Sequence, residues 1–200
     1  LSAAKELVEG GEIHVLTGDY LAELTMALLF RMKMKAPEKG YAVSFLKQMN
    51  DVMGPCLDKN IKIVANAGGL NPKGLAQELQ TIATELGICP KIAYIEGDDL
   101  LPRIADLQNQ GEAFVHLDKG ISLKEAGAMP ITANAYFGGW GVTRALEAGA
   151  DIVIGGRLAD AALVSGPCAW KFGWKEDDWD RLAGAYAAGH IIECGTQATG

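Results

Sequence analysis

The sequence lacks a membrane-spanning segment, a basic surface signature and paired cysteines. No apolar run approaches the roughly 18 residues that a bilayer requires, and Met26–Phe30 is typical of the apolar stretches. Lys and Arg number 18 against 25 Asp and Glu, for a net charge of −7, and no basic tail is present. Such a chain is a poor partner for nucleic acid or anionic lipid, so we expect neither as a partner.

Cysteine is scarce and scattered. The four cysteines are far apart and form no C-x-x-C pair: Cys56, Cys89, Cys168 and Cys194. A disulfide framework or a thiolate zinc site normally shows closer, paired spacing. We therefore predict reduced thiols in the cytoplasm, or in the mitochondrial matrix if the source is eukaryotic.

Several signature motifs are also missing. The chain has no G-x-x-x-x-G-K-[ST], no clean G-x-G-x-x-G in a first βαβ unit, and no G-x-S-x-G elbow. Triphosphate hydrolysis, ordinary nicotinamide binding and serine hydrolysis therefore lack their expected signatures. Cys194 is the one nucleophile candidate near a histidine, His190. We assign no ATP or NAD cofactor and no metal ligand.

What is present is an alternation of β-rich and helical segments in a chain that is 49% hydrophobic and 22% charged. Apolar runs predict strands at 12–17, 61–66, 91–96, 131–134 and 151–154, with 113–117 as a further candidate. Helical patterns lie between them, and Asn71-Pro72 gives one helix a cap and a proline at its first position. The pattern favours an open, mainly parallel α/β sheet with helices on both faces, in Rossmann-like layers. A barrel is the alternative if further strands exist.

Residues 1–200 read as a single α/β domain, because no linker or composition shift divides them. The chain opens at Leu1 without an initiator Met and stops in a run of small and polar residues. We therefore expect it to be incomplete at both ends.

The 25 glycines make up a larger share of the chain than the usual 7%, and they cluster after the predicted strands. Ligands of open parallel sheets bind at the carboxyl ends of the strands. Each of five predicted strand ends pairs glycine with polar side chains: Gly18-Asp19; Asn66-Ala67-Gly68-Gly69-Leu70-Asn71; Glu96-Gly97-Asp98-Asp99; Asn134 to Gly141; and Gly155-Gly156-Arg157 with Asp160. A single such end is usually a plain turn, but five on one sheet edge favour a site.

Two of these ends share the pattern I-x-A-N-A, at 63–67 and 131–135. Each places an asparagine, Asn66 or Asn134, before glycines and a helix. An amide both donates and accepts, so we predict that these two side chains orient a carbonyl. The alternative is that asparagine merely tolerates a left-handed turn.

Glycines before a helix N-terminus are typical of anion sites. We predict that Gly68 and Gly69, Gly138 and Gly139, together with Arg157, hold a phosphate or carboxylate. A buried ion pair with Asp160 is the structural alternative for Arg157.

The acid–base candidates are Asp19, Glu23, Glu96, Asp98, Asp160, His190 and Glu193. Asp19 and Glu23 are four residues apart and could face one side of a helix start, or simply cap the helix and meet solvent. His190 and Glu193 are three apart, which suits an oriented imidazole or a shared metal but is weak evidence. As catalytic residues we predict Asp19, Glu96, Asp160, Asn66 and Asn134.

At these same residues the sequence resembles the acyclic terpene utilisation AtuA family. The similar runs are Thr17-Gly-Asp-Tyr-Leu-Ala-Glu-Leu-Thr-Met, Asn66-Ala-Gly-Gly-Leu-Asn-Pro, Asn134-Ala-Tyr-Phe-Gly, Ala148-Gly-Ala-Asp-Ile-Val-Ile-Gly-Gly-Arg-Leu-Ala-Asp, and Trp179-Asp-Arg-Leu-Ala through Gly189-His and Glu193-Cys-Gly. Leu158 stands where the family usually has valine. The resemblance covers nearly the whole chain and implies a place in the breakdown of branched terpenes through acyl-CoA intermediates.

From the residues and the resemblance together we expect an enzyme that acts on a small acyl-CoA or carboxylate, in a hydratase or lyase step. A non-catalytic ligand-binding or assembly subunit is one alternative. A divalent-metal hydrolase using Asp19, Glu96 and Glu193 is another. The expected partner is a small molecule, and we expect a homo-oligomer or a multi-enzyme assembly, since the apolar content would suit a subunit interface or a further lobe equally well.

Overall fold

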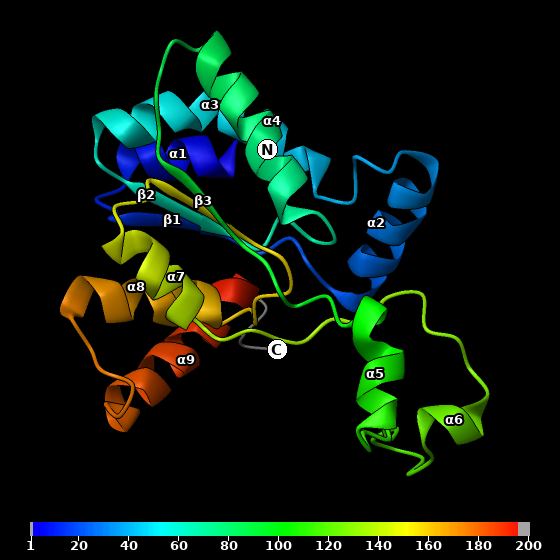
Figure 1. Ribbon diagram of the computed structural model, residues 1–200. Helices are drawn as coiled ribbons and strands as arrows, with labels where there is room; N and C mark the ends of the chain where they lie inside the picture. Colours follow the sequence, from blue (N-terminus) through cyan, green and yellow to red (C-terminus); the bar gives the residue numbers. More distant parts are fainter. Residues whose placement is uncertain (1, 196–200) are drawn as a thin grey trace.

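A small parallel β-sheet forms the centre of the molecule (Figure 1). The computed structural model describes residues 2–195, and within them the sheet contains β1 (Val15–Gly18), β2 (Lys62–Ala65), β3 (Ile92–Ile95) and β4 (Ile152–Gly155). The order is β1-β2-β4-β3 and every pairing is parallel. The predicted open α/β sheet is thus confirmed.

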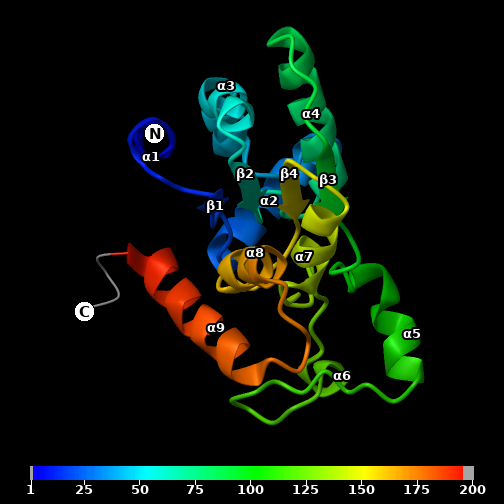
Figure 2. The ribbon, with the colours of Figure 1, turned by 90° about the vertical axis from the view of Figure 1, so that its left-hand side faces the viewer.

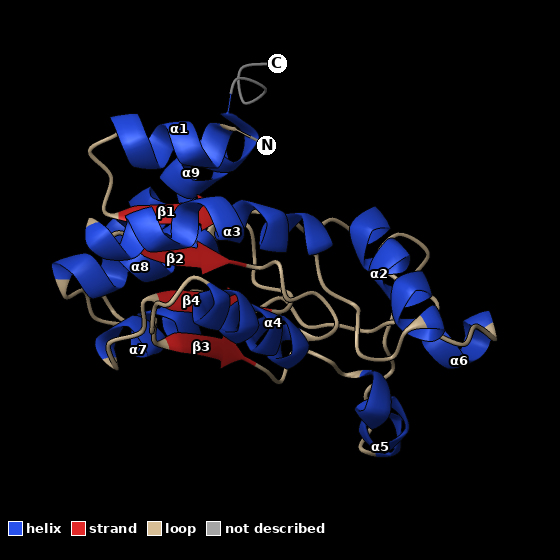
Figure 3. Ribbon diagram, turned by 90° about the horizontal axis from the view of Figure 1, so that it is seen from above, coloured by secondary structure: helices blue, strands red, loops and turns tan. Residues whose placement is uncertain are grey.

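Helices cover both faces of this sheet. In the part of the chain described, they are α1 (Ala3–Gly10), α2 (Glu23–Lys35), α3 (Val43–Asp58), α4 (Pro72–Glu85), the 3₁₀ turn η1 (Leu101–Arg103), α5 (Ile104–Asn109), α6 (Leu123–Ala126), α7 (Trp140–Glu147), α8 (Ala162–Phe172) and α9 (Trp179–Cys194). Helices α1, α3 and α4 lie on one face, and α7, α8 and α9 lie on the other (Figure 2). Helices α2, α5 and α6 extend beyond the carboxyl ends of the strands (Figure 3). None of the described helices is both long and apolar enough to cross a membrane.

Alternate residues of β2 and β4 face the two helical layers, because successive side chains of a strand point to opposite sides. Ile63 and Ile152 pack with the helices α3 and α4, where Phe45, Met49, Met53, Leu75 and Leu79 are buried. Val64 and Val153 pack with Val142, Leu146 and Leu163 of α7 and α8. Burying one such side chain contributes about 2 kcal/mol, so these two clusters fix the sheet on which the site is built.

Several local signals behave as predicted. The side chain of Asn71 accepts a hydrogen bond from the Gly74 amide at 3.0 Å, and Pro72 begins α4. Helices α3 and α8 continue through Pro55 and Pro167. Gly173, with φ +63°, ends α8.

Two predicted strands do not form. Residues 113–117 have no strand, and Leu117 is almost fully exposed. Of 131–134, only Asn134 pairs, in an isolated antiparallel bridge with Asp99. A strand gains its stability from cross-strand and same-face neighbours, and the half-exposed Ile131 has no sheet beside it. Helix α1 was not predicted.

Helix α9 crosses the start of α8 at a point where both segments carry small residues. A Cβ built on Gly189 would lie 2.9 Å from the Cα of Ala161. Only glycine permits this approach without a shift. The crossing brings the two halves of α9 over different parts of the α8 layer.

Candidate functional site

Three neighbouring parallel strands deliver polar side chains to one edge of the sheet. Asp19 follows β1, Asn66 follows β2, and Arg157 follows β4. Parallel strands end at the same edge, which is where open sheets bind ligands. The predicted gathering of strand-end residues is therefore present for these three strands.

Asn66 fixes the position of Asp19. Asn66 is completely buried, and its amide donates to Asp19 Oδ1 at 2.5 Å while its carbonyl accepts from the Tyr20 amide at 2.8 Å. The Leu21 amide also donates to Asp19 Oδ1, at 3.2 Å. Helix α2 begins only at Glu23, with Ala22 before it, so Asp19 does not cap the helix. It is an exposed carboxylate held by a buried amide.

Two further carboxyl groups face Asp19. One ligand atom each of Asp19, Asp160 and Glu193 lies within 4.8 Å of the others. Burial raises the pKa of Asp160, and the charge of Asp19 raises it further against the opposing effect of Arg157. The pKa of Glu193 is raised as well, by burial and then by Asp160. Like charges this close oppose simultaneous ionisation, which agrees with the raised pKa values of Asp160 and Glu193.

These three carboxyl groups line a pocket of about 350 Å³. Its remaining wall is largely apolar and includes Leu163 and Val164 of α8. Pockets of this kind, with apolar walls and a few polar groups, are typical of small-molecule sites.

Arg157 lies beside Asp160, with only 5% of its surface exposed. Its Nη1 donates to the Leu21 carbonyl at 3.1 Å and approaches Asp160 Oδ1 at 3.4 Å. Its Nη2 donates to the Tyr136 hydroxyl at 2.6 Å, and Glu23 Oε1 is 3.3 Å away. The ion pair with Asp160 that sequence offered as the structural alternative is therefore present. Anion binding by Arg157 stays a prediction.

Tyr136 links Arg157 to the exposed Glu23. Its hydroxyl donates to Glu23 Oε1 at 2.5 Å, and the guanidinium carbon lies 4.2 Å from its ring centroid. The hydrogen bond from Tyr136, and then the charge of Arg157, lower the pKa of Glu23. The same bond raises the pKa of Tyr136. Tyr136 was not predicted from the sequence as a site residue. Its position two residues after Asn134 was the signal that could have indicated it.

Asn134 and Asp98 form a second amide–carboxylate pair. The Asn134 amide donates to Asp98 Oδ2 at 2.9 Å, and the Arg157 backbone N–H donates to the same oxygen at 2.7 Å. Asp98 is only 4% exposed. A Cβ on Gly156 would come within 2.6 Å of this carboxylate, so glycine is required there. The pair ties the loop of Asn134 to the end of β4.

The first glycine loop uses its amides inside the protein. The N–H groups of Gly68 and Gly69 donate to Gly155 at 3.0 Å and to Asn66 at 3.3 Å, and those of Leu70 and Asn71 donate to other backbone carbonyls. Gly69 also has φ +53°. A phosphate at this loop would compete with those bonds, and its binding there stays a prediction.

The second glycine pair has unequal surroundings. Gly138 is exposed, whereas Gly139 is buried against Gly166 of α8, whose backbone N would lie 2.6 Å from a Cβ at 139. Gly139 thus permits the contact between α7 and α8. An anion at this pair remains a prediction too.

The remaining candidates are not part of the cluster of Asp19, Asp160 and Glu193, or have side chains outside the described residues. Glu96 and His190 are exposed, and within residues 2–195 neither has a side-chain hydrogen bond or ion pair to the other candidates. The side chain of Cys194 lies outside the described residues. Among the described carboxylates, the group with spacing for a divalent cation contains Asp160 in place of the predicted Glu96. Oxygen ligands of this type suit Mg²⁺ or Ca²⁺.

The fold and this edge define an α/β protein with a pocket lined by carboxyl groups at the carboxyl ends of a parallel sheet. The chain belongs to the acyclic terpene utilisation family, AtuA: the family model matches residues 1–200. No curated protein and no solved structure matches the chain. Membership associates the protein with the utilisation of acyclic terpenes.

Proposed function

We propose that the protein is an enzyme that acts on a small acyl-CoA ester or carboxylate and adds or removes water, or breaks a bond in a related lyase step. The observation that carries the proposal is the pair Asp19 and Asp160 on the wall of a partly apolar pocket. Asp19 is oriented by Asn66, whereas Asp160 has a raised pKa. Two carboxyl groups in unlike environments are the arrangement that acid–base catalysis requires.

Hydration of a 2-enoyl thioester illustrates the chemistry. Asp19 takes a proton from water as the water oxygen bonds to C3 of the substrate. Asp160, protonated, gives its proton to C2, and the carbon–carbon double bond becomes a single bond. The two carboxyl groups have then exchanged protonation states, and one proton moves back from Asp19 to Asp160 to complete the cycle. Dehydration is the same sequence in reverse.

The other residues support this pair. Asn66 acts as a positioning residue through Asp19, and Arg157 does so through Asp160. Direct contact of a substrate carbonyl with Asn66 or Asn134, and of an anionic group with Arg157 and the Gly68-Gly69 loop, would require these groups to exchange their present partners. Such exchange is the specific expectation that a ligand complex would test.

A divalent-metal hydrolase is the second candidate, and the three converging carboxylates favour it. It differs in what it needs: turnover would depend on added Mg²⁺ or Mn²⁺ and would be lost with a chelator. A non-catalytic binding subunit is the third, and it predicts stabilisation by the ligand without turnover.

The test is turnover of branched 2-enoyl-CoA esters, measured by mass spectrometry on the protein with and without chelator. We expect a product heavier by one water, and loss of that product in Asp160→Asn and Asn66→Ala while both variants stay folded by circular dichroism. Asp99→Asn is the matched control, because Asp99 is exposed and accepts only from the Leu101 amide among the described hydrogen bonds. Equal rates in all three variants would reject the assignment.

A further inference from the structure

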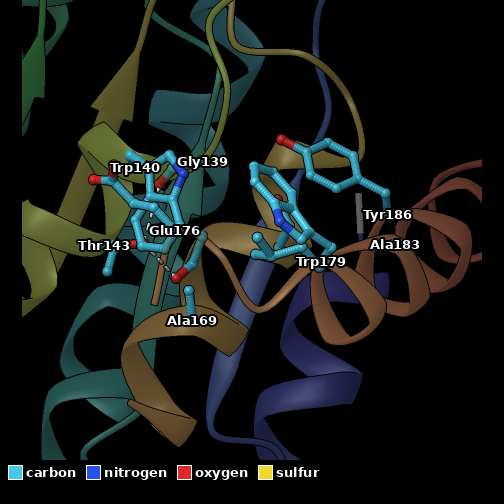
Figure 4. A pocket seen from close by; sticks show the side chains of 11 residues that line it. Gly139, Trp140, Thr143, Ala169, Glu176, Trp179, Ala183 and Tyr186 are labelled. Atoms are coloured by element: carbon cyan, nitrogen blue, oxygen red, sulfur yellow. Dashed lines mark hydrogen bonds between the residues drawn. The ribbon is translucent and has the colours of Figure 1, made fainter. Parts of the chain in front are cut away.

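A second pocket lies between α7, α8 and α9, away from the three carboxyl groups. Its volume is about 570 Å³. In Figure 4 Trp140 and Thr143 of α7 stand on one side, Ala169 of α8 lies between the helices, and Trp179 and Tyr186 of α9 stand on the other side. Aromatic and small side chains dominate this wall, which is typical of a site for an apolar molecule.

Ser165 introduces an unsatisfied polar group into this apolar wall. It lines the pocket and is only 2% exposed. Its hydroxyl is the buried side-chain oxygen that has no hydrogen-bond partner among the described residues. A buried hydroxyl without a partner is unfavourable, because no hydrogen bond offsets its loss of water, and a bound molecule could supply that partner.

The position of this hydroxyl is set by two glycines. A Cβ on Gly139 would lie 2.9 Å from Ser165 Oγ, and a Cβ on Gly166 would lie 2.6 Å from the Gly139 carbonyl. The one hydroxyl proton of Thr143 is already shared by two acceptors, the carbonyls of Gly139 and Gly166, at 3.2 Å and 2.9 Å. Among the described residues, Ser165 is therefore the buried hydroxyl that is left without a partner at the Gly139 end of the pocket.

The charge of the wall narrows the class of ligand further. Of the described residues that line the pocket, none is cationic, and the one charged residue is the exposed Glu176. Such a wall disfavours phosphates and carboxylates. Its aromatic groups and the unpartnered hydroxyl of Ser165 suit an uncharged molecule with an aliphatic body.

We propose that this pocket binds an uncharged aliphatic molecule that carries one hydroxyl or carbonyl oxygen, with that oxygen hydrogen-bonded to Ser165 and the hydrocarbon between Trp140 and Trp179. The site is separate from the carboxylate cluster, and the proposal does not depend on the chemistry assigned there.

The test uses 1-octanol as the probe, with isothermal titration calorimetry and tryptophan fluorescence as readouts on the full chain. We expect saturable binding that shifts the fluorescence. Ser165→Ala should weaken binding about fivefold, the effect of one net hydrogen bond. Trp179→Ala should weaken it about twentyfold, through lost apolar contact. Trp174→Ala is the matched control: Trp174 stacks on Phe172 outside this pocket and should change binding less than about twofold.

A second readout separates ligand binding from mere packing. In the free protein, Ser165→Ala removes the unpartnered hydroxyl and should raise Tm by about 2 °C, although it weakens octanol binding. Trp179→Phe, which keeps an aromatic ring, serves if Trp179→Ala does not fold.

Three results would overturn the proposal. The first is the absence of saturable binding, and the second is binding that is unchanged in both Ser165→Ala and the Trp179 variant. The third is an oligomer of the protein that dissociates on Trp179→Ala, which would assign the pocket to a contact between copies of the chain.

Discussion

The two asparagine–aspartate pairs at the sheet edge use the same side chains for different ends. Asn66 donates to Asp19, and Asn134 donates to Asp98. Asp98 is buried and also receives the Arg157 backbone N–H, whereas Asp19 is exposed and faces two other carboxyl groups. The chain repeats one local motif, I-x-A-N-A, yet only the first copy leaves its carboxylate available to a ligand.

The difference teaches that the surroundings of a carboxylate, more than its hydrogen-bonding amide, decide its role. Charge-assisted bonds to backbone and amide groups stabilise Asp98 where it is. The carboxyl groups of Asp19 and Asp160 repel one another, and this repulsion destabilises the folded protein at that point. Sites of this kind are where proteins tend to concentrate reactive groups.

The sharpest way to break the comparison is to remove the two carboxylates in turn. Asp19→Asn should lower turnover of the proposed substrate about a thousandfold, the middle of the range for loss of a general base. The free energy of unfolding should change by no more than about 0.5 kcal/mol, because Asp19 is exposed. Steady-state kinetics and urea denaturation measure both. A variant with full activity would show that Asp19 is not the base.

Asp98→Ala, in contrast, should lower the stability of the fold. It leaves two donors, the Arg157 N–H and the Asn134 amide, without their buried acceptor. We expect a loss of about 3 kcal/mol in the free energy of unfolding, measured in urea. Asp99→Ala, one residue further along and exposed, is the control and should lose much less. Equal losses in both would contradict a structural role for Asp98.

The two asparagines offer a smaller and more discriminating contrast. Asn66→Ala and Asn134→Ala should each lower the free energy of unfolding, measured in urea, by about 1–2 kcal/mol, because each removes a hydrogen bond to a carboxylate. Only Asn66→Ala should also lower turnover of the proposed substrate, since it removes the donor that holds Asp19 in place. An equal loss of turnover in both variants would end the distinction between the two pairs.

The smallest expected effect is on the pH dependence of stability. The pKa of Asp160 is raised in the folded protein by burial and by Asp19. A folded-state pKa above the unfolded value favours folding fully below the unfolded pKa, near pH 4, and this contribution is lost as the pH rises through the raised pKa. Asp160→Asn should therefore raise Tm at pH 7 by about 2 °C and by less at pH 4. Thermal melts at the two pH values measure it, and an unchanged or lower Tm at pH 7 would mean that the ion pair with Arg157 outweighs the repulsion.

Much of the fold could be predicted from the sequence, because its signals are local. The buried run at β4 and the Asn71-Pro72 start of α4 are determined by residues next to one another. The failed strand at 131–134 depended on whether a neighbouring strand exists, which no local pattern reveals. Helix α1 has only a short amphipathic pattern, and its packing against α3 is what stabilises it as a helix.

The site was predictable only in its outline. The rule that strand ends share an edge brought Asp19, Asn66, Arg157 and Asp160 together correctly. It also included Glu96, which follows the edge strand β3 and lies outside the cluster. Glu193 joins the cluster because α9 crosses α8, and Tyr136 reaches Arg157 through a loop; both depend on long-range packing. The catalytic and anion-binding roles themselves stay predictions.

The crossing at Gly189 and Ala161 has one more consequence. The first half of α9 bears Trp179 and Tyr186, which line the aromatic pocket, and the second half bears Ile192 and Glu193, which line the acidic one. The interaxial distance between α8 and α9 therefore sets the width of both chambers at once. A substitution that lengthens the side chain at 189 would push α9 away from the start of α8 and change the width of both pockets together.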